Sequence, residues 1–276
     1  MTLGDTDHAR VRRQLGPAFT GKAIEDIEPI LQQYVDLFIS QLDKARSEGP
    51  QNMVRWYSWT LNDVIADLAM GVKFDCLVNR KYHSWPSFML MALKTSAIVN
   101  QMRRFGIWWF AERMIPKKQV EARDLFVKSS IEYTQDRIRL EEKRDGGARP
   151  DLIGQLLKET KKQDRPLTEP EIASEAAVLI AAGSETTSVL LSGLTYHLLR
   201  TPEAMTKLKA EIRSSFTKID DINVRSVAKL QYLNLVIEEG LRIFGPASMV
   251  THRVIPAAGH QVLGEWVPGH VSHPHP

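Results

Sequence analysis

Apolar residues recur every three to four positions along most of this chain, which is the spacing that gathers them on one face of an α-helix. Residues from about 250 to 267 differ, with short strand-like stretches and turns at Gly259 and Gly264. The fold class predicted is mainly α with a small β part. The expected helices lie at about 5–18, 23–47, 52–72, 117–144, a short segment opened by Asp151, 168–200, 201–216 and 229–244.

The longest of these helices has clear signals at both ends. Thr168 is a good N-cap, and Glu171 follows three residues later as its capping-box partner. The periodic pattern then runs unbroken to about Arg200, just before Pro202. At 1.5 Å per residue this helix is roughly 50 Å long. A helix of that length must cross the whole domain.

Small residues interrupt the middle of this helix. A glycine such as Gly183 costs about 1 kcal/mol in a helix compared with alanine. Together with Ala181 and Ala182 it leaves a shallow depression in the helix surface. Two interpretations stay open at this point. A flat ligand lies in the depression, or another helix packs closely against it.

An acid and a hydroxyl follow at once, Glu185 and Thr186. The Thr186 hydroxyl can donate a hydrogen bond to the carbonyl of Ala182 and locally open the helix. An opened turn with a hydroxyl and a carboxylate can hold water and relay protons. The alternative is again a packing surface of small residues.

Two further pairs share helix faces. His8 and Arg12 are spaced i, i+4 in a basic segment, which suits the binding of carboxylates or phosphates but also describes a solvated basic face. Glu239 and Arg242 are spaced i, i+3 near the end of a helix that stops at Gly245. Alone, such a pair is an ordinary surface ion pair of roughly 0.2–0.5 kcal/mol.

Composition narrows the remaining choices. The 276 residues carry a net charge of only +3, which argues against a nucleic-acid partner. The single cysteine, Cys76, excludes an internal disulfide and is expected to be a small buried hydrophobe. No run of 18 apolar residues occurs, so we expect no membrane-spanning segment. Histidines near the end of the chain suggest a chelating cluster, but their spacing is irregular: His260, His270, His273 and His275.

Order and spacing connect these separate signals. A His-x-x-x-Arg helix comes first, Ala182-Gly183-Ser184-Glu185-Thr186-Thr187 follows in the longest helix, and Glu239-Gly240-Leu241-Arg242 comes last. In this arrangement the chain resembles the cytochrome P450 family of haem-thiolate monooxygenases. The basic segment before Ala18-Phe19 looks like the haem-edge helix of fungal members. The resemblance implies a single partial cytochrome P450 domain over residues 1–276, built around one long central helix.

The resemblance also implies where haem would lie. Its propionates would be bound by His8, Arg12 and Arg253, and Gly183 would let the porphyrin and oxygen approach the long helix. Residues 83–114 would roof the substrate pocket and touch a membrane surface.

The activity implied is insertion of one oxygen atom from O2 into a small apolar organic substrate, in fungal secondary metabolism or xenobiotic oxidation. Glu185 and Thr186 would be catalytic, delivering protons to dioxygen. Electrons would come from NADPH through NADPH–cytochrome P450 reductase. Full-length members are expected at the endoplasmic reticulum membrane, and this chain, which carries no anchor, in the cytoplasm.

Glu239 and Arg242 would form a buried structural ion pair beside the haem, and a third partner for them is expected further along the chain. Since that segment and the loop with the haem-ligating cysteine lie beyond Pro276 in the family pattern, we expect a protein truncated at both ends, with the Glu239–Arg242 face open to water. Cys76 matches no ligand position, so no metal ligand is expected in this chain. The competing hypothesis is a catalytically inactive remnant with at most a binding role.

Overall fold

The computed structural model describes residues 5–85, 115–144, 149–247, 252–269 and 271–274, with scattered positions between 88 and 109. Helices dominate, which confirms the mainly α fold class. The α-helices described are α1 Asp5–Leu15, α2 Gly21–Ala45, α3 Met53–Met70, α4 Cys76–Asn79, α7 Lys117–Glu142, α8 Leu152–Thr160, α9 Glu169–Arg200, α10 Pro202–Ser215, α11 Val224–Val227 and α12 Gln231–Ile243. Short 3₁₀ turns occur at η1 Gly16–Phe19, η2 Arg46–Glu48 and η3 Ile219–Asp221.

The expected helices are found, with small differences at their ends. The first helix stops at Leu15 and continues as the 3₁₀ turn η1, because Pro17 has no N–H to donate to an α-helical hydrogen bond. Helices α4 and α11 were not expected, and each is only four residues long. The predicted roof of the substrate pocket, residues 83–114, lies largely outside the described residues.

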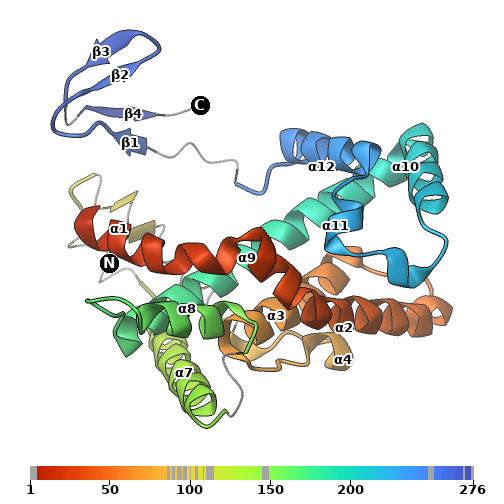
Figure 1. Ribbon diagram of the computed structural model, residues 1–276, viewed down its shortest axis with the longest axis horizontal. Helices are drawn as coiled ribbons and strands as arrows, with labels where there is room; N and C mark the ends of the chain where they lie inside the picture. The colour runs from red at the N-terminus through yellow and green to blue at the C-terminus, as the bar shows by residue number, and fades with distance from the viewer. Residues whose placement is uncertain are drawn as a thin grey trace.

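Helix α9 is the axis of the molecule and crosses it from one side to the other (Figure 1). It packs most extensively against α3 and next against α7. The largest core cluster includes Trp56 and Met70 of α3, Ile153 and Leu156 of α8, and Ile180 of α9. The N-terminal half of α9 therefore lies inside the core.

The sequence expectation of no membrane-spanning segment needs one qualification. By length and composition alone, α9 is apolar enough to cross a bilayer, although no uninterrupted apolar run occurs in it. Helix α9 packs against α3 and α7, but only 22% of its most apolar 18-residue window is buried. Burial inside this fold therefore accounts for only part of the apolar character of α9.

Helix α12 crosses the C-terminal half of α9 at close range. Gly240 of α12 is buried, and a Cβ atom added to it would lie 2.3 Å from Cδ2 of Leu194 on α9. Gly193 of α9 makes the reciprocal approach, since a Cβ there would lie 2.4 Å from Cδ1 of Phe244. Glycine at both positions lets the two helices approach this closely.

A buried network of charges joins α3, α7 and α8. Arg149 forms ion pairs with Asp67 at 2.7 Å and with Asp151 at 3.2 Å. Arg137 pairs with Asp151 at 3.1 Å and with Glu141 at 2.5 Å. Asp151 also accepts a hydrogen bond from an N–H in the first turn of α8, at 2.6 Å. Each of these carboxylates thus has a cationic partner, which is the condition for keeping charges inside a protein.

The β part consists of two small antiparallel sheets that lie away from the helices at one end of the molecule (Figure 1). Strand β1 His252–Val254 pairs with β4 Ser272–Pro274, and β2 His260–Val262 pairs with β3 Glu265–Val267. The predicted turns at Gly259 and Gly264 are confirmed, with φ of 77° and 88°.

Candidate functional site

The first helix brings His8 and Arg12 together at the edge of a cavity of about 430 Å³. Both side chains are exposed, and in the described part of the chain neither forms an ion pair. Apolar side chains of α1 and η1, among them Leu15 and Phe19, line the same cavity. His8 and Arg12 therefore share one face of α1, as predicted.

Glu175 of α9 faces this cavity, and sequence reasoning missed it. Burial raises the pKa of Glu175, and repulsion by Glu171 adds to that effect, whereas attraction by His8 opposes it. One signal in the sequence could have identified it. Glu175 lies seven residues before Ala182, so the two positions share a face of α9.

The middle of α9 holds the predicted acid–alcohol pair. The Thr186 hydroxyl donates a hydrogen bond to the carbonyl oxygen of Ala182, as expected. The helix continues unbroken through both residues, so the expected local opening is not found. Thr186 is exposed and Glu185 is half-buried. With its proton given to Ala182, the Thr186 oxygen can accept a hydrogen bond from the solvent side.

Gly183 faces α3 and not the open face of α9. A Cβ atom at Gly183 would lie 2.9 Å from Cδ1 of Ile65 on α3. Of the two interpretations of the small residues, close helix packing therefore has direct structural support at this position. The exposed surface is provided by its neighbours Ala182 and Thr186. A cofactor-binding role for Gly183 stays a prediction.

Glu239 and Arg242 form the predicted ion pair, with two hydrogen bonds of 2.7 Å. The pair is not buried, since 53% of the Glu239 side chain and 71% of the Arg242 side chain are exposed. This corrects the buried pair implied by the resemblance and agrees with the expectation of an open face in this chain. The hydrogen bond from Arg242 lowers the pKa of Glu239.

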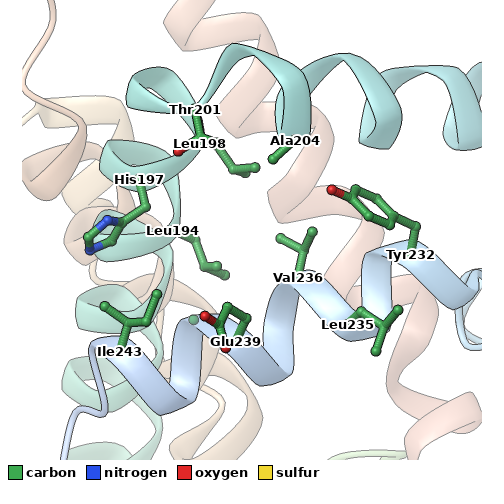
Figure 2. A pocket seen from close by; sticks show the side chains of 11 residues that line it. Leu194, His197, Leu198, Thr201, Ala204, Tyr232, Leu235, Val236, Glu239 and Ile243 are labelled. Atoms are coloured by element: carbon green, nitrogen blue, oxygen red, sulfur yellow. The ribbon is translucent and has the colours of Figure 1, made fainter.

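A second cavity of about 380 Å³ lies beside this pair, between the end of α9, the start of α10 and α12. Figure 2 shows Leu194 and Leu198 of α9 opposite Val236 and Ile243 of α12, with Glu239 among them. Its lining is mostly apolar, and Glu239 links the charged pair to this cavity because its side chain belongs to both.

Cys76 is buried in the core, and its backbone N–H donates to Asp63 of α3 at 2.9 Å. Burial and the nearby Asp63 raise the pKa of the Cys76 thiol to about 12. A thiol that resists ionisation inside the core is a poor metal ligand. This supports the expectation that Cys76 does not bind iron.

Several predictions concern residues that the structure describes only in part. Arg253 lies in β1, where its Cα pairs with that of His273, but the contacts of its side chain lie outside what is described. Two of the tail histidines, His270 and His275, also lie outside the described residues. Their predicted roles stay predictions.

Comparisons with known proteins agree with this geometry. The family model described as Cytochrome P450 matches residues 2–262. A cytochrome P450 monooxygenase of Aspergillus oryzae is 38% identical over 275 residues, covering 99% of this chain and 54% of that protein. An averantin hydroxylase of Aspergillus parasiticus is 33% identical over 265 residues, covering 96% of this chain and 53% of that protein.

A further cytochrome P450 monooxygenase, from Purpureocillium lilacinum, is 32% identical over 269 residues, covering 96% of this chain and 51% of that protein. The chain spans about half the length of the curated relatives that it matches. The match runs from the His8–Arg12 helix through the central helix to the Glu239–Arg242 helix and the start of the small sheets. The chain belongs to the cytochrome P450 family.

Proposed function

We propose that the protein is a haem-dependent monooxygenase that inserts one oxygen atom from O2 into a small apolar organic substrate. The other oxygen atom leaves as water once two electrons and two protons have been added. Relatives named as monooxygenases and as averantin hydroxylases support this reaction class. They also favour a place in fungal secondary metabolism.

The observation that carries the proposal is the pair His8 and Arg12 at the α1–α9 cavity. His8 and Arg12 are exposed, adjacent on one face, and turned to a cavity that borders α9. Haem carries two carboxylates at one edge, and an arginine binds a carboxylate through a bidentate fork. Along α9, Glu175 and Thr186 are about 16 Å apart on the same side of the helix. The residues present therefore fit a flat cofactor with its acidic edge at α1.

Haem, when bound, supplies the electron-transfer and dioxygen chemistry. The protein's own side chains hold the protons that the reaction consumes. Thr186 has its hydroxyl proton on the Ala182 carbonyl and its oxygen free to accept from water. Glu185 is the neighbouring carboxyl group that replenishes the proton. Electrons come from NADPH through a cytochrome P450 reductase, and the full-length enzyme works at the endoplasmic reticulum membrane.

The alternative function is a non-catalytic chain with a binding role, and Cys76 favours it. It is the only cysteine in the sequence, and it is a buried neutral thiol. A thiolate ligand is what gives this family its capacity for O–O cleavage. The 276-residue chain by itself is then expected to bind haem without the chemistry of a thiolate-ligated iron.

Haem titration of the purified chain tests both functions. We expect saturable binding that Arg12→Gln weakens by about tenfold, since a hydrogen bond to a charged group contributes roughly 1.5–3 kcal/mol. Arg13→Gln removes the same charge from the exposed side of α1 and should change nothing. Absence of saturable binding contradicts the cofactor assignment.

The spectrum of the reduced, carbon-monoxide-bound complex tests the non-catalytic alternative for this chain. This chain is expected to lack the band of a thiolate ligand, and its appearance would exclude the non-catalytic alternative. In a chimera that carries the C-terminal half of a relative, Thr186→Ala should divert NADPH electrons to peroxide. Thr187→Ala, the matched exposed neighbour, should not.

A further inference from the structure

Helix α1 has a second face, next to the one that carries His8 and Arg12. This face carries Asp7, Arg10 and Gln14, which contact the connection between α8 and α9 and the start of α9. Only 11% of the Arg10 side chain is exposed, whereas Arg12 and Arg13 are open to solvent. The three arginines of this helix therefore differ in environment, although the sequence places them side by side.

Arg10 is bound to the first turn of α9. Its guanidinium donates a hydrogen bond to Oε1 of Glu171. The other oxygen of Glu171 accepts hydrogen bonds from the backbone N–H of Thr168 at 2.8 Å and from its hydroxyl at 3.0 Å. One carboxylate thus completes the capping box of α9 and holds α1 at the same time.

Gln14 makes a second attachment one turn later on the same face. Its side-chain amide donates to the backbone oxygen of Arg165 at 3.0 Å, and its carbonyl oxygen accepts from the Thr160 hydroxyl at 2.5 Å. Thr160 in turn accepts from the backbone N–H of Leu167 at 2.7 Å. Gln14 is buried, so this attachment is not in competition with water.

Two attachments on one face of a helix restrict its rotation about its own axis. Successive helix residues are about 100° apart around that axis. A shift of α1 by one residue position would therefore turn His8 and Arg12 away from the cavity. We propose that Arg10, held by Glu171, is a positioning residue that sets the rotation of α1 and so directs His8 and Arg12 toward a cofactor carboxylate. In naming haem as the ligand, the inference rests on the proposed function.

The test compares haem with its dimethyl ester, which has the same ring without the two negative charges. Wild-type chain is expected to prefer haem, and Arg10→Gln should reduce that preference by about tenfold while leaving affinity for the ester unchanged. Arg10→Lys keeps the charge and should restore most of the preference. Arg13→Gln is the matched control, because it removes one charge from the same helix without touching α9.

Hydrogen–deuterium exchange of the cofactor-free chain provides an independent readout. Arg10→Gln should speed exchange of the amides of α1 and leave those of α3 unchanged, and Glu171→Gln should do the same. Equal losses of affinity for haem and its ester, or unchanged exchange in α1, would overturn the positioning role. A wild-type chain without preference for haem, together with faster exchange in Arg10→Gln, would instead refute the haem site and leave the control of α1 standing.

Discussion

Arg137 and Arg139 lie two residues apart on α7 and have opposite environments. Only 3% of the Arg137 side chain is exposed, against 67% of the Arg139 side chain. Arg137 pairs with Asp151 and Glu141 in the core, whereas Arg139 pairs with Asp136 at the surface. How much each arginine contributes to the stability of the fold therefore depends on whether water can replace its ion-pair partner.

Arg137→Met is therefore expected to lower the free energy of unfolding by about 3–5 kcal/mol, because it removes the ion-pair partner of Glu141 and leaves Asp151 paired with Arg149 alone. Arg139→Met should stay within about 0.5 kcal/mol of the wild type. Urea denaturation of the two variants measures the difference. Equal losses would mean that the buried network does not contribute as its geometry indicates.

Glu171 gives a prediction on pH. The backbone N–H of Thr168 is the largest cause of its lowered pKa, and Arg10 lowers it further. A carboxyl group whose pKa is depressed on folding contributes stability above its ordinary value of 4.5 and loses it as the pH falls through the folded-state pKa. Glu171→Gln should therefore flatten the acid limb of the stability curve below pH 4.5. Chemical denaturation of both proteins at several pH values checks this. Parallel curves of stability against pH for Glu171→Gln and the wild type would contradict the prediction.

At the level of elements, Gly183 and Gly240 lie where α9 meets α3 and α12, whereas Gly21, at the start of α2, faces open space. An added Cβ would lie 2.3 Å from Leu194 at Gly240 and 2.9 Å from Ile65 at Gly183, while at Gly21 it would meet nothing within 4 Å. Alanine is preferred to glycine in helices by about 1 kcal/mol, and overpacking costs roughly 1–3 kcal/mol. The two effects oppose each other.

Gly240→Ala is expected to destabilise the chain, Gly183→Ala to be close to neutral, and Gly21→Ala to be neutral or slightly stabilising. Thermal melts of the three variants test this order. If Gly183→Ala melts like the wild type but binds haem more weakly, the glycine has a role at the cofactor as well as in helix packing.

Elements with local signals could be predicted from the sequence, and those without them could not. Thr168 and Glu171 lie three residues apart, so the start of α9 was visible in the chain itself. Helix α4 was missed because it is stabilised from a distance: Asp63 of α3 accepts hydrogen bonds from the backbone N–H groups of Cys76 and Leu77. No local pattern marks such a cap.

The same distinction between local and long-range contacts explains which features of the candidate site could be predicted from the sequence. The side-by-side placement of His8 and Arg12 follows from their spacing, and so does the Thr186 hydrogen bond to Ala182. The attachment of Arg10 to Glu171 joins residues 161 positions apart, and the direction of Gly183 is set by Ile65 of another helix. Only the three-dimensional packing determines these contacts.

At the scale of the whole molecule, the Glu239–Arg242 pair marks a surface that is open in this chain. We expect Glu239→Ala and Arg242→Ala to leave the melting temperature of the 276-residue chain unchanged, since water can solvate either partner. In a chimera with the C-terminal half of a relative, the same changes should lower it clearly. Equal effects in both proteins would show that the pair does not depend on sequence outside this chain.

The dominance of the α3–α9 interface has a consequence for synthesis on the ribosome. Ile180, a fully buried core residue of α9, is made 110 residues after Met70, the last residue of α3. At about 5–20 residues per second, roughly 5–22 s pass between the synthesis of α3 and that of the part of α9 that packs against it. During that interval Ile65, which lies against Gly183, and Tyr57, whose hydroxyl is hydrogen-bonded to that of Thr195, lack the partners that α9 provides. Nascent chains of this protein are therefore expected to need chaperone protection until α9 has emerged, and a chain released before residue 169 should aggregate.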